Sequence, residues 1–239
     1  MQRYFSDKKI DNTFLLSKED SYHINKVMRM KTNDQVEVVF NKECYLTKII
    51  DINLDSTLVE IISKLDDKPE MNISVTLAQS LVKEQKMDFI IQKATELGVS
   101  SIIPLATTRS VVKENDKTDK KIIRWQRIAK EASEQSKRVV IPNIESVISV
   151  KDLSLLDNYD VKILCTVREN SKNIKNILSN IKTGVTMLIV VGPEGGFTEK
   201  EEEEMIKNGF ITTSLGDTVL RTETVALFLM SVIHYHDMR

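Results

Sequence analysis

Residues 190–198 read Val-Val-Gly-Pro-Glu-Gly-Gly-Phe-Thr, and the interpretation of the whole chain starts from this stretch. It overlaps the apolar run Met187–Val191, which predicts a buried strand, and Thr198 with Glu201 forms a helix-capping pattern after it. A strand, a glycine loop and a helix in this order place the loop at the carboxyl end of a sheet strand, where α/β proteins bind ligands. A tight turn that binds nothing stays an alternative.

Glycine is otherwise scarce, because the chain has 7 glycines and five of them lie between positions 192 and 216. Glycine lets a ligand approach the main chain closely, so this clustering favours a binding loop. The run is not a Gly-x-Gly-x-x-Gly motif, and no Gly-Lys-Ser or Gly-Lys-Thr sequence occurs. These observations argue against kinases, nucleoside triphosphatases and standard dinucleotide enzymes.

A second loop spans residues 215–224, Leu-Gly-Asp-Thr-Val-Leu-Arg-Thr-Glu-Thr, between a predicted strand and the last predicted helix. Thr222 is a candidate N-cap, and Glu223 would favour the first helical turn through the helix dipole. Arg221 has no such structural role. The helix continues through Val225–Met230, which is apolar on every side and predicts burial on two faces, within the fold or against another subunit.

The pattern in the first third of the chain predicts a small antiparallel barrel or sheet. A helix is expected before it at 18–30, with the side chains of Tyr22, Val27 and Met30 facing the core. A polar stretch with Pro69 marks a boundary, so we expect domains at 1–69 and 70–239. Beyond it, strands and helices alternate, as in a largely parallel sheet covered by helices. Strands are expected at 35–40, 45–52, 57–63, 73–78, 102–105, 161–166, 187–191 and 211–215, and helices at 83–97, 120–137, 199–208 and 223–235.

The composition is that of an ordinary globular protein, with 41% hydrophobic and 29% charged residues. No apolar run approaches a membrane span, the N-terminus lacks a signal-peptide pattern, and two cysteines cannot form a disulfide framework. We therefore expect a cytoplasmic protein with no membrane partner. The formal net charge is -1, yet basic residues predominate in 1–31 and 120–138, which are either solvated helix faces or a surface for a polyanion.

Together with the two loops, motifs along nearly the whole chain resemble the bacterial 16S rRNA uridine-N3 methyltransferases of the SPOUT superfamily. The combination is specific, although each motif alone is weak. Val225 and Thr218 depart from the family pattern, which usually has alanine and a basic residue there. The matching motifs are Arg3-Tyr-Phe, His23-x-x-x-Val-Met-Arg29, Lys93-Ala-Thr-Glu-Leu-Gly98, Arg109-Ser110, Arg124-Trp-Gln-Arg, Glu131-Ala-x-Glu-Gln135-Ser-x-Arg138, residues 192–197, Leu215-Gly and Leu220-Arg-Thr-Glu-Thr.

The resemblance implies an α/β fold class, with an N-terminal PUA-like β-barrel and a C-terminal SPOUT α/β domain that contains a deep trefoil knot. It also implies a homodimer that methylates N3 of one uridine in 16S rRNA, on the assembled 30S subunit. The cofactor would be S-adenosyl-L-methionine, lying among the knot loops. The implied cofactor-binding residues are Thr166, Gly192, Gly196, Leu215, Gly216, Leu220 and Thr224.

Two further expectations concern these cofactor loops. Adenine requires an apolar slot and main-chain hydrogen bonds more than charged side chains, which suits glycines and leucines. A valine in place of Gly196 should crowd the loop, and Glu194 and Glu223 are candidates for offsetting the sulfonium charge.

Methylation of uracil N3 requires loss of the N3 proton, so positioning of the base and stabilisation of its anion should contribute most. On the predicted helix, Arg127, Glu131, Gln135 and Arg138 share one face. We expect Gln135 and Arg138 to contact the base, with Arg221 as a further cation, and no residue stands out as a general base. Without the resemblance, this face reads as the solvated side of an amphipathic helix.

Contacts to RNA phosphates would come from basic residues in both domains. No metal site is expected, because His23 stands alone and His234 and His236 do not share a helix face. The predicted RNA-binding residues are Arg3, Lys26, Arg29, Lys31, Lys86, Lys93 and Arg109.

Two other functions stay open. A different SPOUT methyltransferase, acting on ribose 2′-O or guanine N1, is disfavoured by Leu220-Arg-Thr-Glu-Thr, since the ribose enzymes typically have a Ser-Leu-Asn loop there. A non-catalytic RNA-binding factor would keep the barrel but would not bind S-adenosylmethionine.

Overall fold

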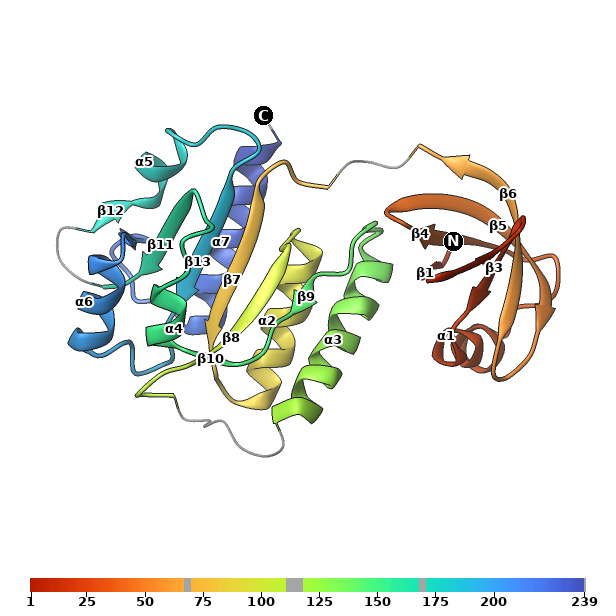
Figure 1. Cartoon of the computed structure of the whole chain (residues 1–239), viewed down its shortest axis with the longest axis horizontal. Coiled ribbons are helices and arrows are strands. Elements are labelled where there is room, and N and C mark those ends of the chain that lie inside the picture. The colour runs from red at the N-terminus through yellow and green to blue at the C-terminus, as the bar shows by residue number, and fades with distance from the viewer. Residues whose placement is uncertain (67–69, 111–117, 168–170, 239) are drawn as a thin grey trace. The chain divides into compact units, whose positions relative to one another are not determined.

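The structure is a computed structural model that describes residues 1–66, 70–110, 118–167 and 171–238. The chain forms two compact units. The first comprises Met1–Glu70 and Ser133–Val140, and the second comprises Met71–Ala132 and Ile141–Arg239. Each unit has its own sheet and its own hydrophobic core (Figure 1).

In the first unit, a curled sheet half closes into a barrel around a core that includes Tyr4, Phe14, Val38 and Val59 (Figure 1). The three predicted strands are confirmed, whereas three strands of only three or four residues near the N-terminus are too short for alternation to reveal. In pairing order the strands are β1 (Arg3–Phe5), β4 (Gln35–Phe40), β5 (Glu43–Ile52), β6 (Thr57–Leu65), β3 (Thr13–Leu16) and β2 (Lys8–Ile10).

The single helix expected at 18–30 is wrong in detail. It consists of α1 (Lys18–Tyr22), capped by the Ser17 side chain, and a π-helix at His23–Val27. The π-helical turn changes which side chains face inward, so Ile24 is fully buried while Tyr22 and Val27 are exposed. Met30 packs against this core as predicted.

The second unit contains a sheet in which every strand pair is parallel (Figure 1). The predicted alternation of strands and helices is confirmed, and the short strands β9, β10 and β12 were not predicted. The pairing order is β10 (Ile148–Ser149), β8 (Ser101–Ala106), β7 (Ser74–Ser80), β13 (Thr186–Val191), β11 (Val161–Cys165), β14 (Ile211–Ser214) and β12 (Lys172–Asn173), with β9 (Asn143–Ile144) also on β8.

Successive side chains of the central strands pack into different hydrophobic cores on opposite faces of the sheet, because side chains alternate between the two faces along a strand. In β13, Ile189 packs into a core that includes residues of α2 (Glu84–Glu96) and α7 (Thr222–Asp237), whereas Val190 packs into one with residues of α4 (Val150–Ser154) and α6 (Glu199–Lys207). Helices therefore cover both faces of this sheet. The remaining helices are α3 (Thr118–Gln135) and α5 (Ile174–Leu178).

The helix boundaries show which local signals were reliable. Gly98 follows α2 with a φ of +96°, as the predicted left-handed C-terminal position requires, and Thr198 with Glu201 forms the predicted capping box of α6. The short helices α4 and α5 were not predicted. In the described residues, no helix is both long enough and apolar enough to cross a membrane. The trefoil knot stays a prediction.

Candidate functional site

The loops that follow three adjacent parallel strands of the second unit lie together at the carboxyl ends of these strands. β11 pairs with β13 as far as Leu164–Val190 and with β14 as far as Cys165–Thr213. By this register, Thr166, the first residue after β11, lies beside Gly192, the first residue after β13. Leu215, the first residue after β14, lies one residue further along the strand direction. The structure thus brings the three predicted cofactor loops together at the edge where open α/β sheets bind ligands.

The loop at 192–197 is fixed by Arg109, which follows strand β8. One guanidinium nitrogen of Arg109, Nη1, donates hydrogen bonds to the carbonyl oxygens of Gly195 at 2.9 Å and Phe197 at 3.1 Å. The loop also closes on itself, because the Gly196 N–H donates to the Pro193 carbonyl at 2.9 Å. The arginine predicted to bind RNA therefore shapes the glycine loop through hydrogen bonds to its main chain.

The glycines at this edge leave main chain open to a ligand. Gly196, with φ +67°, and Gly216, with φ +122°, have left-handed backbones, and a Cβ on either would meet no described atom within 4 Å. A Cβ on Gly192 would instead lie 3.0 Å from a carbon of the Phe197 ring. Backbone strain is therefore an obstacle to valine at Gly196 in addition to the expected crowding of the cofactor loop, which stays a prediction. Such open main chain fits a nucleoside ligand.

Thr222 does not have the expected capping role. The N-cap of α7 is Arg221, and the Thr222 hydroxyl donates a hydrogen bond of 2.6 Å to the Gly192 carbonyl. The same hydroxyl accepts a hydrogen bond of 3.1 Å from Nε2 of Gln79, a fully buried residue near the end of β7. Sequence reasoning missed Gln79, although its position near the end of a predicted strand was an available signal.

A second connection between the same two loops runs through Lys86, in the first turn of α2. Its Nζ lies 2.9 Å from a carboxylate oxygen of Glu194 and 3.3 Å from one of Glu223. The hydrogen bond that Lys86 donates to Glu194 lowers the pKa of the Glu194 carboxyl group and raises the pKa of Lys86. Both carboxylates considered for the sulfonium charge thus face a lysine in this structure.

The acidic start of α6 stabilises two loops. Thr166 donates a hydrogen bond of 2.8 Å from its hydroxyl to the carboxylate of Glu202, which is buried. Glu201 accepts hydrogen bonds from the N–H groups of Thr198 and Thr108, each at 2.8 Å. The capping role of Glu201 was predicted from the sequence, whereas its contact with Thr108 and the contact of Glu202 with Thr166 were missed.

Of the remaining predicted cofactor residues, Leu220 is half buried and Thr224 is exposed in the first turn of α7. A cavity of about 450 Å³ lies beside Leu215, between α5 and α7, and is lined by Phe228, Val232 and Tyr235 among others. Phe228 and Tyr235 are exposed although they are large and apolar. The fold of this chain alone therefore does not complete the expected burial of Val225–Met230, since Phe228 is exposed, and cover by another subunit stays a prediction.

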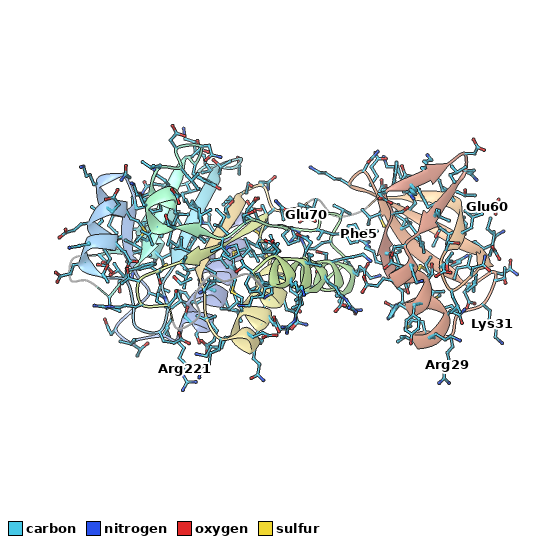
Figure 2. All side chains as sticks on the ribbon, turned by 60° about the horizontal axis from the view of Figure 1, so that its bottom comes forward. Phe5, Arg29, Lys31, Glu60, Glu70 and Arg221 are labelled. Atoms are coloured by element: carbon cyan, nitrogen blue, oxygen red, sulfur yellow. The ribbon has the colours of Figure 1, made fainter. Side chains whose placement is uncertain are left out.

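The predicted catalytic residues belong to different units. Helix α3 ends at Gln135, so Arg138 is not on its face. Instead, the turn after the helix is a Schellman motif with Lys137 in the left-handed conformation, in which the Arg138 N–H donates to the Ser133 carbonyl at 3.0 Å. Gln135 and Arg138 group with the first unit, while Arg221, in the second, is exposed and points outward (Figure 2).

Arg138 is 8% exposed and is paired with Glu70, also in the first unit. Its Nη2 and Nε donate to one carboxylate oxygen of Glu70 at 2.7 and 3.0 Å, while the other oxygen accepts from the Val139 N–H at 3.0 Å. Arg3, predicted to bind RNA, is also buried and donates to Glu37 at 2.9 Å and to the Arg138 carbonyl at 3.2 Å. The guanidinium of Arg138 is thus rigidly oriented.

The remaining predicted RNA-binding residues are Lys26, Arg29, Lys31 and Lys93. The first three are exposed at the end of the π-helix and beyond it, and Figure 2 shows Arg29 and Lys31 projecting outward from the first unit. Lys93 is paired within α2 to Glu96 at 2.8 Å. Among the described residues, no group of three or more His, Cys, Asp or Glu side chains could hold a metal ion.

Comparison with known proteins gives consistent matches to both units. The family model for the RNA methyltransferase domain matches residues 69–234, and the RNA methyltransferase PUA domain matches residues 16–62. The ribosomal RNA small subunit methyltransferase E of Bacillus subtilis is 38% identical, over 98% of this chain and 96% of the relative.

Two solved structures match at both the sequence and the fold level. A ribosomal RNA small subunit methyltransferase E from Neisseria gonorrhoeae, bound to S-adenosyl methionine, is 27% identical with a TM-score of 0.88, over 98% of this chain and 97% of that one. A putative methyltransferase from Legionella pneumophila, in complex with the bound cofactor SAM, is 28% identical with a TM-score of 0.90, at the same coverage of both chains. The chain, which matches a PUA domain and an RNA methyltransferase domain, therefore belongs to the ribosomal RNA small subunit methyltransferase E family.

Proposed function

We propose that this chain transfers a methyl group from S-adenosylmethionine to N3 of a uridine in 16S rRNA, acting on the assembled 30S subunit. The observation that carries the proposal is the meeting of the Thr166, Gly192 and Leu215 loops at one sheet edge, with main chain open at Gly196 and Gly216. Relatives named ribosomal RNA small subunit methyltransferase E supply the substrate class.

The cofactor, when bound, supplies an electrophilic methyl carbon on a sulfonium. Thr166, Gly192, Gly196, Leu215, Gly216, Leu220 and Thr224 are the residues that would hold it. Open main chain at the two left-handed glycines allows a nucleoside to approach backbone N–H and C=O groups. Because Arg109, Thr222 and Glu202 already fix these loops by hydrogen bonds, little reorganisation is needed when the cofactor binds.

The uracil must lose its N3 proton and present the anion to the methyl carbon. In our proposal Gln135 binds the base edge, and Arg138 stabilises the negative charge on a uracil carbonyl oxygen, with Arg221 as a further cation. The support for Arg138 is its restricted orientation, since Glu70 holds its guanidinium through two nitrogens. A fixed cation stabilises developing charge better than a mobile one.

RNA binding would depend first on Lys26, Arg29 and Lys31, because these three cations are exposed. Arg3, Lys86, Lys93 and Arg109 make contacts within the protein, so we expect them to contribute less to phosphate binding than the sequence suggested. Exposed Phe228 and Tyr235 on α7 support the homodimer that the family resemblance implies. The proposed site of action is the cytoplasm, where ribosomal subunits assemble.

The proposal is tested with purified protein, tritiated S-adenosylmethionine, and 30S subunits or 16S rRNA that lack the modification. We expect 3-methyluridine as the only labelled nucleoside, with 30S subunits as the better substrate. A labelled 2′-O-methylnucleoside or 1-methylguanosine would identify one of the other SPOUT activities. RNA binding without cofactor binding would identify a non-catalytic factor.

A further inference from the structure

Two consecutive residues at the start of α7 are connected to the glycine loop by independent contacts. Thr222 donates directly to the Gly192 carbonyl, and Glu223 is joined to Glu194 through the ammonium group of Lys86. The loops after β13 and β14 are 30 residues apart at the Thr222–Gly192 contact. These contacts therefore define the spacing between the glycine loop and the start of α7.

The Thr222 contact is the buried one. Thr222 is 5% exposed, and its hydroxyl donates to the Gly192 carbonyl and accepts from the Gln79 amide. A hydroxyl group can make both bonds at once, because it has one hydrogen to donate and lone pairs to accept. Removing the hydroxyl would leave the Gly192 carbonyl and the Gln79 amide without this partner. Unsatisfied groups in a buried position are costly, so the loop would shift to find new partners.

The Lys86 contact is more exposed, and its alternative role is RNA binding. Its Nζ, however, lies within 3.3 Å of two carboxylates, one on the glycine loop and one in the first turn of α7. An ammonium that is already paired with two carboxylates is less available to a phosphate. The same arrangement links the glycine loop to the start of α7, as Thr222 does one residue earlier.

We propose that Thr222 and Lys86 are positioning residues that set the spacing between the glycine loop and the start of α7, and thereby the affinity for S-adenosylmethionine. The inference rests on the proposed location of the cofactor site. We assign neither residue a contact with the reacting atoms, and Lys86 would contribute to cofactor binding rather than to RNA binding.

The test compares Thr222→Val with Thr222→Ser, which keeps the hydroxyl, and Lys86→Met with Lys86→Arg, which keeps the charge. Calorimetry measures binding of S-adenosylmethionine and of S-adenosylhomocysteine, which lacks the sulfonium charge, to the full-length protein. Filter binding measures affinity for an unmodified 16S rRNA transcript. Amide hydrogen exchange at 192–197 is followed in the cofactor-free protein, and thermal melting confirms that each variant is folded.

We expect Thr222→Val to weaken both cofactor ligands about tenfold and Lys86→Met about threefold, with faster exchange at 192–197, unchanged RNA affinity and near wild-type behaviour in the conservative variants. Equal loss for both ligands is the signature of positioning. If Lys86→Met changes S-adenosylmethionine binding alone, the carboxylates act on the sulfonium charge and the proposal is wrong. Loss confined to RNA binding, or unchanged cofactor affinity in both Thr222→Val and Lys86→Met, also overturns it. Failure of the wild-type protein to bind either ligand would instead refute the proposed cofactor site.

Discussion

Glu201 accepts two hydrogen bonds from Thr108, at 2.8 Å from the backbone N–H and 3.0 Å from the hydroxyl, although 93 residues separate them. Its other carboxylate oxygen accepts from the N–H and hydroxyl of Thr198, at 2.8 and 2.9 Å. One side chain therefore caps α6 and joins the loop after β8 to the loop after β13. Arg109 joins the same two loops from the opposite direction through Gly195.

Replacing Glu201 with glutamine should destabilise the second unit by about 1 to 2 kcal/mol, because an amide cannot accept at both positions. Urea unfolding measures the effect. Glu203→Gln is the matched control, since Glu203 is exposed on the same helix, and it should change stability by less than about 0.5 kcal/mol. Equal effects of the two substitutions would refute the role given to Glu201.

The contribution of Glu201 should depend on pH in a defined direction. Burial by itself would raise its pKa, but hydrogen bonds from Thr108 and Thr198 together lower it below the ordinary value of 4.5. A lowered pKa means that this stabilisation is complete above 4.5 and is lost as the pH falls through the folded-state pKa. The stability difference between wild type and Glu201→Gln should therefore be constant near neutral pH and shrink below 4.5. A difference that grows on acidification would contradict the assignment.

Arg109→Met should weaken S-adenosylmethionine binding about fivefold, because the Gly195 and Phe197 carbonyls lose the donor that shapes their loop. Lys93→Met removes a cation that is paired within α2 and should leave cofactor affinity unchanged. Calorimetry of both variants gives the comparison. If Arg109→Met instead reduces the salt dependence of RNA binding and spares the cofactor, Arg109 is a phosphate contact.

Gly196→Ala should cost about 1 to 2 kcal/mol of stability and should also weaken cofactor binding, since an L-residue resists a φ of +67°. Gly184 provides the control because its φ is +81°, a Cβ there would meet no described atom within 4 Å, and it precedes β13 at the other end of the strand. Thermal melting should show similar losses for both alanine variants. Only the Gly196 variant should lose cofactor affinity, and equal affinities would remove Gly196 from the site.

Arg138→Ala should reduce methyl transfer about a hundredfold while S-adenosylmethionine affinity stays within twofold of wild type, because the guanidinium is assigned to the base and not to the cofactor. Single-turnover methylation and calorimetry measure the two quantities. Lys151→Ala, which removes an exposed cation on α4, is the control for a general effect of charge. A proportional loss of transfer and cofactor affinity would contradict the assigned role.

The sequence was most informative where local chemistry decides the structure. Apolar strands, the capping box at Thr198 and Glu201, and the left-handed position of Gly98 were all predicted and confirmed. These features depend on residues close together in the chain, so composition and spacing are sufficient to reveal them. The meeting of the two glycine-bearing loops followed from the rule that parallel strands align their carboxyl ends.

Contacts between distant residues could not be predicted in the same way. Thr222 was considered a candidate cap because threonine is often used in this way before a helix, whereas its hydroxyl instead donates to the carbonyl of Gly192. The face containing Arg138 was extrapolated from helical periodicity, and the Schellman turn at Lys137 interrupts that periodicity. The π-helix at His23–Val27 likewise interrupts the α-helical periodicity, so different side chains of the first unit face its core.

The most direct test of the proposed activity is the modification state of ribosomal RNA after deletion of the gene. Small-subunit RNA from the deletion strain and from its parent would be digested and compared by mass spectrometry. We predict the loss of one 3-methyluridine from 16S rRNA and its restoration by the wild-type gene but not by the Arg138→Ala variant. An unchanged nucleoside profile in the deletion strain would contradict the proposed function.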